Sequence, residues 1–185
     1  MIPGLPPLVL LETQTLTAGT GASNTIRFPA SGNIADHANF PTGSRHIVGI
    51  IEARSDEADD LIRSVSMQFN GDTGTNYDVQ ILYGIGSTAA ALWETAGSTS
   101  AFMASPANNN DANGFGASAF LIPHAFGTTG FLAGLSMSGQ MEDGVRIGTT
   151  QWRNTGAVTS MLLTQDGSGE FLIGSTFSLY VVDES

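Results

Sequence analysis

The sequence contains no cysteine and no lysine. Because cysteine is absent, disulfides, thiolate catalysis and zinc–sulfur sites are excluded. Because lysine is absent, the Gly-Lys-Ser/Thr step of a phosphate-binding loop is excluded as well. Six arginines stand against 17 acidic residues, and the net charge is −11. A field of this sign repels phosphate backbones, so we expect no nucleic acid as a partner.

Long apolar runs are also missing. No stretch approaches the roughly 20 apolar residues of a membrane span, and residues 1–7 lack the basic segment of a signal peptide. We therefore expect a protein made in the cytoplasm and without membrane contact. Only 12% of residues are charged and 41% are hydrophobic, a balance that argues against intrinsic disorder.

The remaining pattern is a series of short segments rich in β-branched and aromatic residues, separated by Gly, Asn, Asp, Ser and Thr. Residues 64–69, 78–83 and 176–181 alternate apolar and polar side chains, which is typical of half-buried antiparallel strands. Strands are predicted over 8–16, 24–28, 45–53, 63–70, 77–84, 117–122, 131–138, 145–153, 158–164 and 175–182. This spacing favours an all-β antiparallel sandwich or barrel.

Helical signal is confined to two single turns. One is predicted at 55–62, and the other at 87–95 with Ser87 as its N-cap. Residues 96–116 are rich in Gly, Ser, Ala and Asn, so we expect a long loop there.

The 185 residues suit a single domain preceded by an arm. Residues 1–7 carry three of the seven prolines, and proline fixes an extended backbone without an N–H donor. We therefore divide the chain into an extended N-terminal arm with the first strand, 1–16, and one β-sandwich domain, 17–185. A frayed terminus is the alternative interpretation of the arm.

Candidates for chemistry are weak. His37, His46 and His124 lie far apart and show no metal-binding spacing, so each is interpreted as a loop or edge residue. Serine is plentiful, but no Gly-x-Ser-x-Gly elbow occurs, so a hydrolase triad is poorly supported. An acidic cluster offers the paired carboxylates of a glycosidase, although a solvated loop is the favoured interpretation. Its members are Glu52, Asp56, Glu57, Asp59 and Asp60.

The loop from Asn70 to Asp78 is a second candidate. Asn70, Asp72 and Asp78 offer oxygens of the kind that Ca²⁺ takes, but no bidentate glutamate follows at the required distance. Asn-Gly and Asp-x-Gly steps favour a turn locked by side-chain-to-backbone hydrogen bonds. The turn is the preferred interpretation, and no metal or other cofactor is expected.

Three stretches resemble a family of tailed-bacteriophage virion structural proteins. They lie at 52–78, 120–139 and 147–180, and the most specific phrases are QFNGDTGTNYD at 68–78 and GEFLIGSTFSLYVV at 169–182. The resemblance implies an antiparallel β-sandwich of jelly-roll type and a role in the virion, on the head or the tail. It implies no catalytic residues.

The leading hypothesis is a non-enzymatic capsid decoration (cement) protein that binds the outer surface of a phage head and stabilises it. Its partners would be the major capsid protein and further copies of itself, with a trimer favoured by the three-fold axes of an icosahedral head. Arginine suits planar, bidentate interface contacts. The interface candidates are Pro3, Leu5, Pro6, Pro7, Leu8, Arg54 and Arg63.

Two alternatives stay open. One is a tail- or fibre-associated protein that binds a host receptor or glycan through a rim of loop residues. The candidates for that rim are Trp93, Asn108, Asn109, Asn110 and Phe115. The other is a small lectin or glycan-active enzyme unconnected with a virion, in which Trp93 and Trp152 stack on sugars, although a core or interface role is commoner for tryptophan.

Overall fold

The computed structural model describes residues 6–18, 21–56, 64–98, 101–104, 114–140, 144–165 and 169–184. Within these ranges the chain forms twelve strands and one turn of 3-10 helix, η1 (Ile34–Asp36). The strands are β1 Leu8–Thr15, β2 Thr25–Phe28, β3 His46–Ala53, β4 Val65–Phe69, β5 Tyr77–Ile85, β6 Thr88–Ser98, β7 Ala101–Ala104, β8 Gly116–Ile122, β9 Leu132–Gln140, β10 Gly144–Trp152, β11 Met161–Gln165 and β12 Thr176–Val182. No helix in the described ranges is long and apolar enough to cross a membrane.

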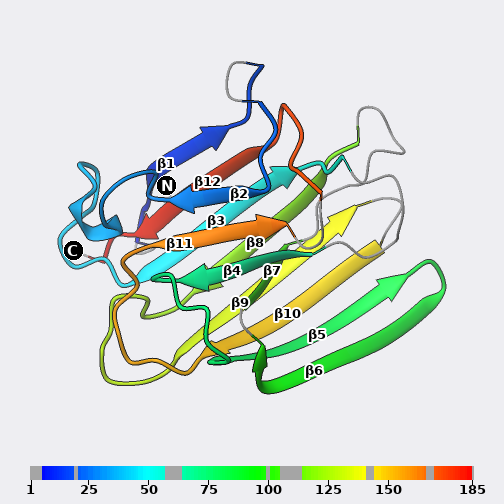
Figure 1. Cartoon of the computed structure of the whole chain (residues 1–185). Coiled ribbons are helices and arrows are strands. Elements are labelled where there is room, and N and C mark those ends of the chain that lie inside the picture. The colour runs from blue at the N-terminus through cyan, green and yellow to red at the C-terminus, as the bar shows by residue number, and fades with distance from the viewer. Residues whose placement is uncertain are drawn as a thin grey trace.

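The strands form two sheets that pack face to face (Figure 1). The large sheet has eight strands in the order β1-β12-β3-β8-β9-β10-β5-β6, and the small sheet has four in the order β2-β11-β4-β7. Every pairing between neighbouring strands is antiparallel. The predicted antiparallel β-sandwich is therefore confirmed, while its assignment to the jelly-roll type stays a prediction.

The core between the sheets follows from the period-two alternation. On β4 the side chains of Val65, Met67 and Phe69 are fully buried, and Ser66 and Gln68 between them are not. Strand β12 behaves in the same way, with every second residue buried. Because successive side chains of a strand point to opposite faces, these residues meet in one apolar layer.

Residues 87–95 do not form the predicted helical turn. Ser87 lies in the two-residue turn Gly86–Ser87, and residues 88–95 belong to β6, which pairs with β5 after that turn. Gly86 has φ +54°, and a glycine in the first position of a two-residue turn matches the twist of a hairpin. The helical propensity of the Ala-Ala-Ala-Leu run is overridden by pairing with β5.

The predicted loop over 96–116 is also wrong in part. β6 continues to Ser98, and β7 occupies 101–104 at the edge of the small sheet. Residues 105–113 lie outside the described residues, as does most of the helical turn predicted at 55–62. The strand predicted at 158–164 begins only at Met161.

One close contact inside the sandwich gives a direct test of this packing. The ring of Phe120 on β8 lies over Gly49, its neighbour in register on β3, and a Cβ added at Gly49 would overlap that ring. We therefore expect Gly49→Ala to lower the free energy of unfolding by about 1–3 kcal/mol, as overpacking does. Thermal or urea unfolding measures the change.

Gly130→Ala is the matched control, because a Cβ at Gly130 meets open space. It should leave the unfolding midpoint nearly unchanged. Equal stability of the two variants would contradict the close packing of Phe120 against β3.

Candidate interaction surface

The turn that holds the Ca²⁺ candidates is locked by protein hydrogen bonds. Asp72 Oδ1 accepts from the Gly74 amide at 2.9 Å and from Asn76 Nδ2 at 3.1 Å. Asp72 Oδ2 accepts from Trp152 Nε1 at 2.7 Å. Both carboxylate oxygens therefore have protein donors, and the network ties the turn to β10.

Asn70 and Asp78 are engaged in the same way. Asn70 Oδ1 accepts from the backbone amides of Thr159 and Ser160 at 2.7 and 3.1 Å. The Asp78 carboxylate accepts from Arg153 Nε at 2.8 Å and from Arg153 Nη2 at 2.9 Å. These hydrogen bonds hold the turn in place, and we call the turn from Asn70 to Asp78 with its partners Trp152 and Arg153 the clamp. The described residues include no cluster of three or more metal-ligating side chains.

The clamp shifts the pKa values of three of its members, and hydrogen bonding to Asp78 raises the pKa of Arg153. Burial raises the pKa of Asp72, but hydrogen bonds from Trp152, Gly74 and Asn76 together lower it by more. The pKa of Asp72 therefore lies below its usual value. Burial also raises the pKa of Tyr77 to about 12. The Tyr77 hydroxyl accepts from the Phe69 amide at 3.0 Å and donates to the Asp72 carbonyl at 3.1 Å.

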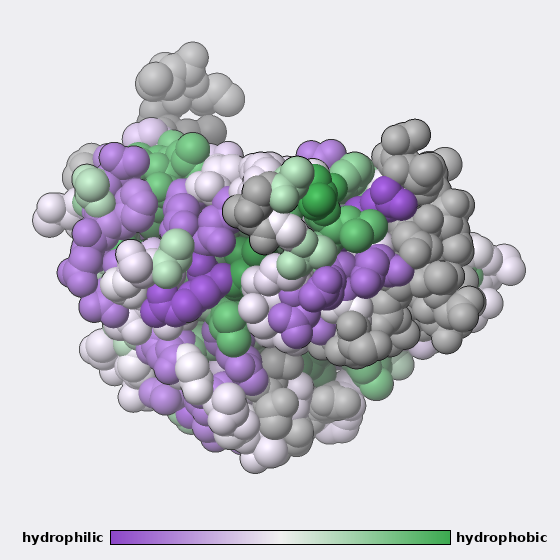
Figure 2. Space-filling model, turned by 45° about the horizontal axis from the view of Figure 1, so that its top comes forward, coloured by the Kyte–Doolittle hydropathy of each residue, from purple (hydrophilic) through white to green (hydrophobic). Residues whose placement is uncertain are grey.

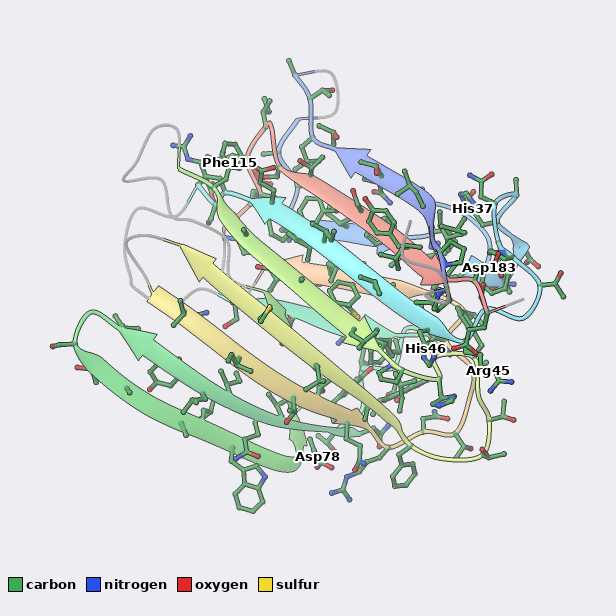
Figure 3. The ribbon with its side chains drawn as sticks, turned by 180° about the vertical axis from the view of Figure 1, so that it is seen from behind. His37, Arg45, His46, Asp78, Phe115 and Asp183 are labelled. Atoms are coloured by element: carbon green, nitrogen blue, oxygen red, sulfur yellow. The ribbon has the colours of Figure 1, made fainter. Side chains whose placement is uncertain are left out.

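Two of the histidines come together at the start of β3. His46 Nδ1 accepts from the His124 amide at 3.0 Å, so the proton is on Nε2, which donates to Glu184 Oε1 at 2.7 Å. Arg45 Nε lies 3.3 Å from the other oxygen of Glu184. Figure 3 shows Arg45 and His46 at one end of the sheet, with Phe115 at the opposite end. Both ring nitrogens of His46 are occupied, so it fastens the C-terminal segment and is not available as a general base.

The other predicted site residues are dispersed. Pro6, Pro7 and Leu8 are exposed at the start of β1. Arg54 is half-buried, and its amide donates to Ser175 Oγ at 3.1 Å. The remaining interface and rim candidates lie outside the described residues, apart from the two aromatic ones; they are Pro3, Leu5, Arg63, Asn108, Asn109 and Asn110.

The two aromatic rim candidates do not share one site. Trp93 on β6 is 70% exposed, whereas Phe115 precedes β8 and is half-buried. Strands β8 and β6 are four positions apart in the large sheet, which separates them by about 19 Å at the usual strand spacing. The structure therefore does not bring these residues together in one rim.

The most unusual feature lies on the outer face of the large sheet, which points away from the small sheet. On β9 the inward residue Leu132 is followed by Gly134, Ser136 and Ser138 on the same face, while Leu135 and Met137 point outward. A sheet with one face in water normally shows the opposite arrangement, apolar inside and polar outside. Strand β9 is therefore reversed with respect to a sheet face in water.

Strand β10 repeats the reversal. Val145 and Ile147 point outward and are 64% and 54% exposed, while Arg146 and Thr150 are buried between the sheets. Strand β7 packs across β8, β9 and β10, where most inward residues of β9 and β10 are small and Arg146 is the large exception. The apolar side chains that would ordinarily fill this part of the core are on the outside.

The strand register joins these outward residues into continuous rows. Ile50, Ala119, Met137, Ile147 and Leu82 are successive neighbours across β3, β8, β9, β10 and β5. The next row runs through Val48, Leu121, Leu135, Thr149 and Gln80. Directly opposed side chains lie about 4.5–5.5 Å apart, so each row is an unbroken contact surface.

We call the large apolar residues of these rows that are more than a third exposed, together with Val145 beside them on β10, the central patch. They are Ile50, Leu82, Leu121, Leu135, Met137, Val145 and Ile147, and each is between 37% and 64% exposed. The charged residues on this face lie at its margins, with Glu52 at one end of β3 and Asp78 at the start of β5. A contiguous apolar patch of this kind marks an interaction site.

The central patch is hollowed at one end by a shallow groove of about 710 Å³. Its lining combines the small residues Ala117, Ala119 and Gly139 with the larger side chains of Ile50 and Met137. The surface of the patch is therefore not flat, and the groove has room for a side chain of a bound partner.

The small sheet presents an ordinary surface. Its outward residues include Arg27 on β2, Ser66 and Gln68 on β4, and Thr164 on β11. On the side that Figure 2 presents, hydrophilic residues predominate and the apolar ones form separate patches. Among the described residues, the outer face of the large sheet is therefore more apolar than that of the small sheet.

No protein-family model, no curated protein and no solved structure matches this chain. The fold and the surface define the class, an antiparallel β-sandwich with an apolar outer face. Sequence analysis identified the strands β9 and β10 but not the direction of their side chains. Serine and glycine alternate with large apolar residues in Leu-Ser-Met-Ser-Gly at 135–139, but this alternation does not say which set faces the second sheet.

The lowered pKa of Asp72 makes the stability of the clamp depend on pH. A carboxylate with a lowered pKa in the folded state stabilises it above the unfolded value of about 3.9, and this stabilisation is lost as the pH falls through the folded value. We expect Asp72→Asn to unfold at a lower temperature than the original chain near neutral pH. The gap should narrow as the pH falls below about 4.

Trp152→Phe serves as the second variant, because it keeps the carboxylate but removes its shortest hydrogen bond. Trp152→Phe should reduce the pH dependence of the unfolding temperature without abolishing it. Thermal unfolding followed by circular dichroism across this pH range is the measurement. A gap between the original chain and Asp72→Asn that stays constant with pH would contradict this account of the clamp.

Proposed function

We propose that this chain is a non-catalytic structural protein of a phage virion that decorates the outer surface of the head. It docks on the major capsid protein through the outer face of the large sheet and stabilises the shell. The observation that carries the proposal is the reversed alternation of β9 and β10, which places large apolar residues on an uncovered face. In an isolated monomer these apolar side chains stay in contact with water and add no stability. In a subunit that packs against another surface they are buried, which stabilises the assembly.

The size of the face supports this role. Eight strands at a spacing of about 4.8 Å, each roughly 25 Å long, give a face on the order of 900 Å². A standard protein–protein interface buries about 800 Å² on each partner. One face of this sheet is therefore large enough for a specific and stable contact.

The chemistry of the face supports it as well. Removing the exposed half of each central-patch side chain from water contributes about 1 kcal/mol. Seven such residues give roughly 7 kcal/mol before the costs of association. Because the centre of the patch carries no charge, the net charge of −11 opposes contact there less than on other surfaces.

The virion assignment rests on the sequence resemblance. The phrases at 68–78 and 169–182 that carry it form the Asp72 clamp and strand β12. Location on the head surface and a homo-oligomer are part of the proposal. A trimer stays a prediction, since no three-fold contact is selected by the described residues.

A second candidate is a tail- or fibre-associated protein that binds a host receptor or glycan. The observation that favours it is Trp93, whose side chain is 70% exposed beside Gln80 in the register of β5 and β6. An exposed indole next to an amide is a common way to hold a sugar ring. Binding on a glycan array that is lost in Trp93→Ala would favour this function over head decoration.

The test of head decoration is the number of copies in purified particles. Met137→Lys places a charge in the middle of the central patch, where its burial against the shell is costly. We expect hundreds of copies per particle for the original chain and about tenfold fewer for Met137→Lys, the ratio that 1.4 kcal/mol gives. Gel densitometry against the major capsid protein measures both.

Leu162→Lys is the matched control, because Leu162 points outward from the small sheet. It should leave the copy number unchanged. A count of a few dozen copies or fewer for the original chain would contradict a head location. An undiminished count for Met137→Lys would contradict docking through the central patch.

A further inference from the structure

The edge of the large sheet at β6 is open. Within the described part of the chain, β6 pairs with β5 on one side and with no strand on the other. It is the longest described strand, with 11 residues, and Figure 1 shows it at the margin of the sheet. Along such an edge, backbone N–H and C=O groups point outward and are ready to pair with another strand.

Strand β1, at the opposite edge, is protected. Pro6 and Pro7 precede it, and a bulge interrupts its register between Leu10 and Glu12. The Glu12 carboxylate also accepts from the Ala30 amide at 3.2 Å. Proline, bulges and charge are devices by which natural edge strands avoid pairing, so this edge is closed to another chain.

Strand β6 carries none of these devices over its first six residues. Thr88–Trp93 contains no charge and no proline, and it pairs with β5 without a register shift. Its apolar side chains are open on both faces of the sheet, with Leu92 47% and Trp93 70% exposed. A long, regular and apolar edge of this kind is covered in a stable assembly or it aggregates.

We propose that β6 pairs antiparallel with β6 of a second copy of this chain, about a two-fold axis perpendicular to the sheet and centred on Ala91. In this register Leu92 lies opposite the partner's Ala90 and Trp93 lies opposite the partner's Ala89, so a large residue faces a small one in each pair. The paired residues from 89 to 93 are all uncharged. Two chains of charge −11 therefore approach each other along a neutral strip.

The second copy fits this edge better than an unrelated strand does. A two-fold contact presents the same surface on both subunits, and an antiparallel pair of identical strands has this symmetry. Residues related by an axis at Ala91 have the same parity, so those on one face of the sheet pair with each other. The result is one continuous sheet of 16 strands.

The two-fold axis also determines how the two central patches of the dimer are oriented. Because it is perpendicular to the sheet, both outer faces stay on the same side of the dimer. A shell protein would then meet two patches at once, and linked binding of this kind raises the effective affinity. The pairing itself does not depend on the proposed function, and it makes a two-fold contact where icosahedral symmetry alone favours a three-fold one.

The first experiment is the solution mass of the full chain by light scattering at micromolar concentration. We expect twice the chain mass of 19.2 kDa for the original protein. Leu92→Lys should give 19.2 kDa, since lysine is a residue that blocks edge pairing. Ile147→Lys, in the middle of the central patch, should remain a dimer but should no longer bind to phage particles. Failure of the pairing and failure of the proposed function can therefore be told apart.

The second experiment uses the absence of cysteine, which leaves a single thiol in each variant. Opposed residues of an antiparallel pair have Cα atoms about 4.5–5.5 Å apart, within the range of a disulfide. Under mild oxidation Ala91→Cys should give a covalent dimer. Ala133→Cys, exposed on the outer face of β9, should not.

Either experiment can overturn the proposal. A monomeric original chain, or a trimer or dimer whose mass is unchanged in Leu92→Lys, would exclude pairing through β6. Equal disulfide formation by Ala91→Cys and Ala133→Cys, or none by either, would exclude the register centred on Ala91. Circular dichroism of Leu92→Lys that matches the original chain shows that the loss of mass is not unfolding.

Discussion

The direction of the side chains on β9 and β10 is the constraint on which the architecture depends. A shift of one residue in the register of a strand moves its whole apolar set to the other face. Here the nine-residue pairing of β9 with β10 fixes Leu135, Met137 and Ile147 on the outside. The same pairing places Gly134, Ser136, Arg146 and Thr150 on the face toward the small sheet.

Two regions of the sandwich therefore differ in how their side chains are packed. Under β2, β11 and β4 the sandwich has a conventional core, with Phe28, Met67 and Phe177 buried. Along β9 and β10 the inward positions between Leu132 and Trp152 are largely small or polar, with Ser136, Ser138, Arg146 and Thr150 buried there, and large hydrophobic residues lie outside. Burial of those residues against a partner would add the stabilisation that the monomer does not obtain there.

Much of the fold could be predicted from the sequence, because alternation and turn residues act locally. The strands at 45–53, 77–84 and 175–182 were located within a residue or two, and the Asp72 turn was recognised by its Asn-Gly step. Strand β6 was missed because its alanine run has helical propensity, although Gly86–Ser87 is a hairpin signal. The central patch could not be predicted, since alternation does not reveal which side of a strand faces the second sheet. The face that becomes the inner one depends on β7, which is distant in sequence and comes to lie against β9 and β10 only when the chain folds.

The most direct test of the central claim is the oxidation of methionine in the free protein and in purified particles. Met137 is 59% exposed in the patch, while Met67 and Met161 are fully buried and act as internal controls. The account predicts that peroxide oxidises Met137 readily in the free chain and slowly in particles, with Met67 and Met161 protected in both. Equal oxidation of Met137 in the two states would contradict the claim that this face is covered when the protein works.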